Sequence, residues 1–590
     1  MPSQFLALVR HFFGRFFDNE FIAQNADVQV TVTKTLALLA SPGMLLPFFR
    51  YTTYLALDRY PPEARLATLW FDRCFFFSFA ILVMGGVTVL EWDALFPDRR
   101  DYVSLIPLPI RSRTIFLAKV GALALFLLGF TAAVSGVSTV LFPIIAYRFT
   151  NSHELASVGL KTLAGLGGLG WTIAAQGISV LAASAFVFLS LIALEGLLLN
   201  ILSVRWFRRA SVYVQCAMIF ALLSLFFLFP NIAASIPDLK ARHAALLYAF
   251  PPAWFLGLNE VLLGSTDAVF RSLARIAEIA VGGTALVAAA AYALAYRRHV
   301  RRTLESIEGS ESGRTRVDEW MTMLADRIAR HATERAVVAF IGKTMARSAR
   351  HRIFLAAYAG VGCAFVLQAL VGTGLRQAWL SIPLVLSFFV LSGMRYIFTL
   401  PSELPANWLF RVTESDERRR ALDGARTAML WFGVAPLFAM LAPFYFVLWT
   451  PGVALAHLAF SIAISVLLLE VLLLDFWKIP FTCSYPPGKA NVTILWIFYW
   501  LAFTTYAYSM ATLEAWMVGR PMRLVGFYGV ATMVWIGFQL YRKRWDGVGF
   551  TLVFDDVADP VVRTLNLSEF AWRRKRTVGL EPLIHVHKRE

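Results

Sequence analysis

SLIALEGLLLN at residues 190–200 and SVLLLEVLLLD at residues 465–475 agree at six of their eleven positions. Each stretch places one glutamate, Glu195 or Glu470, inside a long apolar run. The shared leucines carry little information, but a carboxylate within a membrane span is unfavourable and therefore rare. A polar residue, Asn200 or Asp475, ends each stretch. The two stretches predict an internal duplication, with two homologous membrane halves in one polypeptide.

The composition predicts a polytopic membrane protein, because 58% of the 590 residues are hydrophobic, against about 45–50% apolar residues in soluble domains. A helix needs about 20 apolar residues to cross the hydrocarbon. We expect an all-α fold of about twelve transmembrane helices, arranged as two parallel six-helix repeats with interfacial amphipathic helices. The apolar runs are centred near residues 45, 84, 128, 187, 220, 286, 363, 389, 438, 463, 501 and 532.

Lysine and arginine divide unevenly between the two sets of connecting segments, with 41 in one set and 11 in the other. Cytoplasmic segments are the richer in these residues, so both termini are predicted to be cytoplasmic, in a bacterial inner membrane. This bias also accounts for the net charge of +17 without a nucleic-acid partner. If the first apolar run, TLALLASPGMLLPFF, does not cross, the N-terminus changes side.

The predicted organisation has four segments. Residues 1–296 form the first six-span half, and residues 297–335 form a cytoplasmic linker. Residues 336–541 form the second half, and residues 542–590 form a basic cytoplasmic tail.

A helix lying on the membrane is predicted before the first span, within residues 1–32. Apolar side chains recur there at helical spacing, at Phe5, Val9, Phe12 and Phe16. The alternative is an ordinary cytoplasmic helix. ERAVVAFIGKTMARSARHR, at residues 334–352, has a basic amphipathic pattern and occupies the same place before the seventh span. It is a second sign of duplication.

The loop after the second span of each half is the third sign of duplication. The loops read DALFPDRRDYVSLIPLPIRSRTIFLAK at 93–119 and TLPSELPANWLFRVTESDERRRALDGAR at 399–426. Each has a proline directly after the span, then a mixed-charge segment, then basic residues. Because proline interrupts long helices, short fixed pieces that could contact a soluble partner are predicted. A plain solvated loop remains the alternative.

The order of these elements resembles the permease subunit of ABC-2 type ATP-binding-cassette exporters. DALFPDRRDYVSLIPLPI is similar to the coupling region of that family. FPPAWFLGLNEVLLGS, at residues 250–265 and including Pro251, Pro252 and Trp254, is similar to its outer re-entrant element. The chain departs from the family in two ways. Only TLEAWMVGRPMR separates the last two spans of the second half, and most family members dimerise from single six-span units.

The resemblance implies a transport subunit without an ATPase site of its own. It implies two copies of a cytoplasmic ATPase, which would hold ATP and magnesium. VVAFIGKT, at 337–344, lacks the first glycine of a phosphate-binding loop. The chain itself is therefore predicted not to be an enzyme and to hold no cofactor. The candidate residues for coupling to the ATPase are Asp98, Arg99, Arg100, Asp101, Glu414, Ser415, Asp416 and Glu417.

Glu195 and Glu470 have two possible roles. Each is predicted to lie in the inner part of its span, where it could line a gate at the cytoplasmic mouth. Alternatively, each is a structural carboxylate that is hydrogen-bonded to a neighbouring helix or protonated. No metal site is predicted, because the four cysteines have no CxxC spacing.

Two other function classes remain open. A secondary transporter of the 6+6 type has the same number of spans, although its usual glycine-containing loop motif is missing and few ionisable residues are expected near span centres. A non-transporting membrane scaffold is the third possibility. The apolar lining favours an amphipathic or lipid-like substrate, with membrane lipid as a partner.

Overall fold

The computed structural model describes residues 2–16, 28–96, 110–150, 165–305, 316–372, 375–402, 418–474, 476, 478–482, 492–517 and 520–545. Every regular element in these residues is a helix. The predicted all-α class is therefore confirmed for the part of the chain that the structure describes.

Two helical bundles follow one another along the chain. The first contains α1 (Pro2–Arg15), α3 (Val28–Ala56), η1 (Leu57–Arg59), α4 (Pro62–Leu90), α5 (Trp92–Leu95), α7 (Ser112–Thr150), α9 (Gly165–Ile201), α10 (Val204–Ala234), α11 (Ile236–Ala241), α12 (Ala245–Ala249), α13 (Pro251–Leu262) and α14 (Ala268–Glu305).

The second bundle contains α15 (Arg316–Ile328), α16 (Ala332–Arg347), α17 (Ala349–Gly372), α18 (Leu375–Ile397), α20 (Arg418–Met429), η4 (Leu430–Val434), α21 (Ala435–Leu448), α22 (Pro451–Leu472), α23 (Val492–Met517) and α24 (Pro521–Trp545). The segment η4 is a π-helical turn between α20 and α21.

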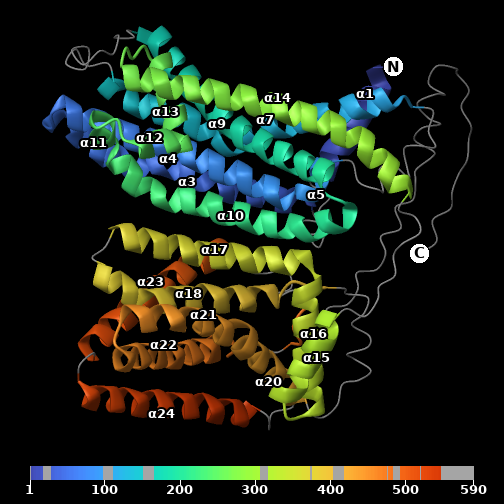
Figure 1. Ribbon diagram of the computed structural model, residues 1–590. Helices are drawn as coiled ribbons and strands as arrows, with labels where there is room; N and C mark the ends of the chain where they lie inside the picture. The colour runs from blue at the N-terminus through green and yellow to red at the C-terminus, as the bar shows by residue number, and fades with distance from the viewer. Residues whose placement is uncertain are drawn as a thin grey trace, which may run out of the picture.

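The long helices of both bundles run between two common ends (Figure 1). We call these the α16 end, where α1, α5, α15, α16 and α20 lie, and the α11 end, where α11 and α12 lie. The bundles meet along α10 and α17. Phe227 and Phe365 cross this boundary with ring centroids 4.5 Å apart, so the contact between the bundles is apolar there.

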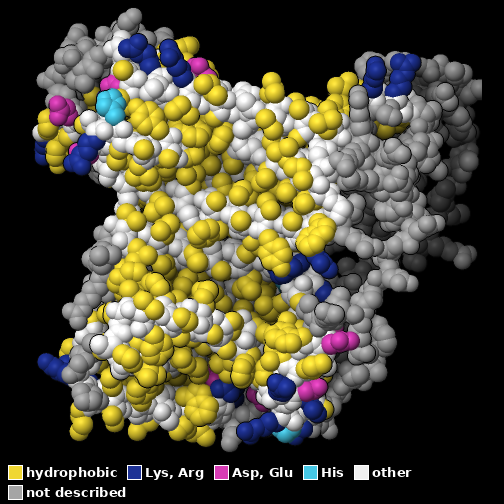
Figure 2. Space-filling view, viewed as in Figure 1, with side chains coloured by type: hydrophobic (Ala, Val, Ile, Leu, Met, Phe, Trp, Pro, Cys, Tyr) yellow, Lys and Arg dark blue, Asp and Glu magenta, His cyan; other side chains and the backbone are white. Residues whose placement is uncertain are grey.

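Ten helical stretches among the described residues are long and apolar enough to cross a membrane. They lie in α4, α7, α9, α10, α14, α17, α18, the α20–η4–α21 run, α22 and α24. Figure 2 shows hydrophobic side chains over the middle of the visible face, with lysine and arginine gathered towards the ends. The chain is thus an integral, multi-pass membrane protein. The predicted runs near 45 and 501 fall in α3 and α23, which are not among the ten.

The helix before the first long helix forms, and its apolar face packs on α7. Phe12 and Phe16 are 0% and 2% exposed. Val9 lies against Gly121 of α7, where a Cβ atom would be 3.5 Å from Val9 Cγ2. The prediction of a helix was correct. Its position on the membrane surface stays a prediction, and the structure adds that these residues pack on a small-residue surface of α7.

Close helix contacts in the first bundle depend on small residues, as is common in membrane proteins. A Cβ atom on Gly257 of α13 would lie 2.5 Å from Leu273 Cβ and 2.9 Å from the Phe270 carbonyl oxygen, both of α14. Neither of these atoms is the free end of a flexible side chain, so α13 and α14 would have to move apart.

We predict that Gly257→Ala lowers the apparent unfolding temperature in detergent by several degrees, because overpacking costs about 1–3 kcal/mol. Gly282→Ala on α14 is the matched control, since nothing lies within 4 Å of its added Cβ. There the better helix propensity of alanine should leave stability unchanged or raised. Equal effects of the two substitutions would contradict this packing.

Candidate functional site

A buried ion pair joins α4 to α13. Arg73 contacts Glu260, and the two side chains are 3% and 1% exposed. The preceding residue, Asp72, accepts a hydrogen bond of 2.6 Å from the Tyr54 hydroxyl and one of 3.1 Å from Arg50 Nε. The Asp72–Arg73 pair of α4 therefore ties α3 to one side of that helix and α13 to the other.

The three predicted residues of the outer re-entrant element lie at the start of α13. Pro251 and Pro252 open the helix, where a missing backbone N–H does no harm. Trp254 donates its indole N–H to the Tyr248 carbonyl oxygen at 2.7 Å. Asn259, on the next part of the helix, is 1% exposed. This short helix therefore brings polar side chains into the interior of the first bundle.

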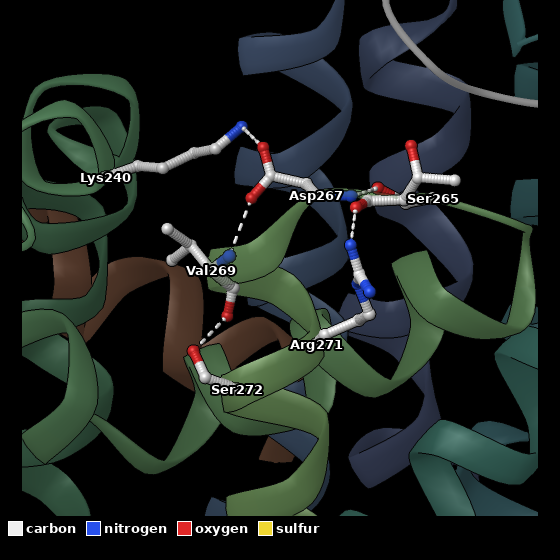
Figure 3. A network of polar contacts seen from close by, with 7 residues as sticks. Lys240, Ser265, Asp267, Val269, Arg271 and Ser272 are labelled. Carbon is white, nitrogen blue, oxygen red and sulfur yellow. Dashed lines mark hydrogen bonds and ion pairs between the residues drawn. The ribbon is translucent and has the colours of Figure 1, made fainter.

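A second network holds the segment between α13 and α14 at the α11 end (Figure 3). Asp267 caps α14, accepting a hydrogen bond of 2.8 Å from the Val269 N–H, and pairs with Lys240 of α11 at 2.6 Å. Burial acts to raise the Asp267 pKa, but the Lys240 ammonium and the N–H groups of Val269 and Phe270 outweigh it. The pKa of this carboxyl is lowered.

Glu195 is buried, and its neighbours in sequence connect α9 to α14. A Cβ atom on Gly196 would lie 3.0 Å from Ala291 Cβ. Asn200 donates from Nδ2 to the Ala291 carbonyl oxygen at 3.0 Å. The Glu195–Asn200 part of the repeated stretch therefore lies at a close helix crossing towards the α16 end.

Glu470 is completely buried and is held by side chains of two other helices. Arg426 of α20 and Arg542 of α24 both contact its carboxylate. Gln539 of α24 approaches the same carboxylate at 3.5 Å. Asp475, which ends the repeated stretch, lies outside the described residues. The structure thus brings together two arginines and a glutamate that are far apart in sequence.

A further buried pair lies in the second bundle towards the α11 end. His457 Nδ1 of α22 lies 2.5 Å from Glu514 Oε1 of α23. The rings of Tyr445 and Trp449 lie 4.6 and 5.0 Å from the imidazole. The histidine is 2% exposed, so an acid–base pair is enclosed by aromatic side chains.

The eight residues predicted to couple the chain to an ATPase, Asp98–Asp101 and Glu414–Glu417, lie outside the described residues. The segments that flank them end in α5 and α18 and resume in α7 and α20. All four flanking ends are at the α16 end (Figure 1).

The expectation of few ionisable groups near span centres is wrong for α4. Asp72 and Arg73 lie close to the middle of its apolar stretch, Glu63–Leu90. The sequence signal was visible as two charges in a run rich in phenylalanine. The role of these two charges could not be predicted, because Glu260 is distant in sequence and only the tertiary structure places it beside Arg73.

The chain matches no family model, no curated protein and no solved structure. The chemistry of the described residues is that of paired charges between helices. Within those residues, histidine, cysteine, aspartate and glutamate form no group of three that could hold a metal ion. The segment VVAFIGKT lies within α16, where a Cβ on Gly342 would meet Met321 and Phe432.

We predict that Arg73→Met lowers stability by about 3–5 kcal/mol, since it leaves a buried carboxylate without its partner. The double variant Arg73→Met, Glu260→Met should recover most of that loss. Unfolding in detergent measures both, with Arg275→Met on the exposed face of α14 as control. Glu260→Met alone is measured as well, and a double variant that loses as much stability as the two single variants together would contradict a direct pairing.

The lowered pKa of Asp267 predicts a pH dependence. Its pairing stabilises the fold above the unfolded value of about 4 and is lost as the pH falls through the lower folded value. At pH 7, Asp267→Asn should cost about 0.2–1 kcal/mol, and the difference from the parent chain should vanish in acid. Glu319→Gln, at an exposed side chain of α15, is the control. A difference that persists in acid, where the carboxyl is protonated in both the folded and the unfolded chain, would contradict the assignment.

Proposed function

We propose that this protein is the membrane-spanning permease of an ABC-2 type exporter. It would move an amphipathic or lipid-like substrate, using ATP hydrolysed by a separate subunit. The order of elements supports this proposal: a short helix, two long helices, a loop, and further long helices, repeated in each bundle.

The observation that carries the proposal is a matched helix contact in the two bundles. Ala118–Ala122 of α7 and Ala421–Ala425 of α20 both read A-x-x-G-A. The glycine of the first faces Val9 of α1, and the glycine of the second faces Val337 of α16. In each bundle, therefore, a short helix, α1 or α16, packs against the same five-residue pattern. The pattern lies where the chain leaves the predicted coupling loop and enters the third span.

Other contacts also correspond between the bundles. In the first, α4 packs on α9 and α10, and α9 packs on α14. In the second, α18 packs on α22 and α23, and α22 packs on α24. One contact departs from the pattern, since α3 packs mainly on α7 whereas α17 packs on α18 and on α10. These correspondences support two parallel six-helix repeats, with α3 and α23 completing twelve spans.

A glutamate shortly before the last long helix gives a further correspondence. Glu260 precedes α14 and Glu514 precedes α24. Each is buried and contacts a basic side chain, Arg73 or His457. The second half has no counterpart of α13 among its described residues, so Glu514 reaches its partner from the end of α23 itself.

In the proposed orientation, the α16 end is cytoplasmic, and both termini lie on that side of a bacterial inner membrane. The predicted loops at residues 98–101 and 414–417 would then face two copies of a soluble ATPase. ATP and magnesium would bind to those subunits, and this chain would hold no cofactor.

The mechanism requires that the ATPase contact the loops differently in its open and closed states, since a partner bound equally in both shifts nothing. The loops lead directly into α7 and α20, which hold α1 and α16. A push on either loop would therefore be transmitted to a long helix. The bundles would move as bodies about the apolar α10–α17 contact.

A gradient-driven carrier is the second candidate, and the buried ionisable groups favour it. His457 pairs with Glu514 and Arg73 with Glu260, all at side chains no more than 3% exposed. Intramembrane pairs of this kind mark proton or ion pathways in some carriers. Each also has a structural role here, since each joins two helices. An ATPase partner would distinguish the two candidates.

We predict that charge reversal at Arg99, Arg100 and Asp101 lowers partner-stimulated ATP turnover by about fivefold or more, without loss of membrane insertion. Turnover of the purified complex and protease protection in vesicles measure the two effects. Arg520→Glu, on an exposed residue at the opposite end, is the control. Unchanged turnover would remove these residues from the coupling surface. Absence of any ATPase partner would favour the carrier or a scaffold.

A further inference from the structure

An apolar groove of about 340 Å³ lies on the second bundle between the η4–α21 run and α22. The groove is open to the surroundings of the helices rather than enclosed. Seven side chains line it: Leu430, Trp431, Val434, Ala435, Phe438, Ile462 and Val466. The π-helical turn η4 contributes the first three of them. π-helical turns are rare and often found at functional sites.

Helical spacing along both walls places the charged cluster at Glu470 next to the groove. On the α20–η4–α21 run, Arg426 is followed at successive turns by Leu430 and Val434. On α22, Val466 lies one turn before Glu470. Residues about four positions apart share a helix face. The two helices that form the walls of the groove therefore carry Arg426 and Glu470 at its α16 end.

The charge at this end of the groove is basic. Arg426 and Arg542, whose side chains are 20% and 22% exposed, converge on the buried Glu470. Among the described side chains of α20, Glu470 and the last turn of α24, three are basic (Arg420, Arg426 and Arg542) and two are acidic (Asp423 and Glu470). The partner that fits this end is therefore an anion.

Aromatic side chains lie at the level of the cluster. The Arg426 guanidinium lies 5.9 Å from the ring centre of Trp535. Trp431 lines the groove and is 49% exposed. Tryptophan is enriched where lipid headgroups meet acyl chains. Trp535 beside Arg426 therefore places the cluster at headgroup depth, and Trp431 marks the start of the groove at chain depth.

We infer that this groove binds an anionic phospholipid, with the phosphate at Arg426 and Arg542 and one acyl chain along the apolar walls. From Arg426 to Phe438 the helix rises about 18 Å, close to the roughly 15 Å of one leaflet of the hydrocarbon core. A second copy of this chain would fit less well, because its charge at the same end is also basic. The site goes beyond the proposed function, since binding needs neither an ATPase nor transport.

The test uses the full chain in phosphatidylcholine vesicles that contain either brominated phosphatidylglycerol or brominated phosphatidylcholine. Bromine quenches tryptophan fluorescence on contact, and the difference between the parent chain and Trp431→Phe isolates the signal from the groove. We expect quenching at Trp431 to favour the anionic lipid, with about a fivefold loss of preference for each arginine removed.

Three sets of variants separate the headgroup contact from the chain contact. Arg426→Gln with Arg542→Gln should abolish the preference, whereas Arg209→Gln on an exposed residue at the α16 end should not. If the unpaired Glu470 prevents folding, adding Glu470→Gln removes that charge too, and the same loss is expected. Ala435→Phe should fill the groove and reduce quenching, with Met440→Phe, at a residue 66% exposed and outside the groove, as its control.

Four outcomes would overturn the site. Equal quenching by both lipids would mean ordinary boundary lipid. A preference that survives loss of both arginines would place recognition elsewhere. Displacement of the preference by inorganic phosphate, with Ala435→Phe having no effect, would indicate a free-anion site without a chain contact. No quenching by either lipid, together with a dimer in size-exclusion chromatography, would mean that a second copy covers the groove.

Discussion

The buried contact between Arg73 and Glu260 determines how the first bundle can be built. A charged side chain inside a membrane protein is strongly unfavourable unless it has a partner, so α4 and α13 must stay in register for the other helices to pack around them. His457 and Glu514 impose the same constraint on α22 and α23. Both pairs lie towards the α11 end of their bundles. Towards the α16 end, further polar contacts join the helices. In the first bundle Asn200 joins α9 to α14, and in the second Arg426 and Arg542 join α20 and α24 to Glu470 of α22. In each bundle, polar contacts thus join the helices at two levels along their length.

The boundary between the bundles has a different character. Aromatic and aliphatic side chains of α10 and α17 meet there, as in the contact between Phe227 and Phe365. Apolar surfaces can slide or rotate against each other without breaking charged contacts, whereas separating α4 from α13, or α22 from α23, would break an ion pair. Under the proposed function, motion would therefore be concentrated at this boundary. The structural role of a carboxylate also gains support at Glu470, where two arginines hold it.

The sequence predicted much of the fold. Long apolar runs gave the all-α membrane class and the approximate centres of the spans, because hydrocarbon demands helices of a minimum length. Glu195 and Glu470 are both buried, in α9 of the first bundle and α22 of the second. The A-x-x-G-A pattern carries no signal by itself, because small residues are common in such helices. Only the tertiary structure shows that it forms the contact surface for α1 and α16. The partners of Arg73 and Glu470 could not be predicted either, since each lies more than forty positions away.

The residues alone therefore determined that this chain folds in a membrane and that its long apolar segments are helices. These are local or compositional properties that follow from the transfer of side chains between water and lipid. The tertiary structure decided which charges meet, which face of α1 is covered, and where an apolar groove continues into a pair of arginines. Those features depend on helix rotation and crossing, which packing between distant segments sets and a linear pattern does not record.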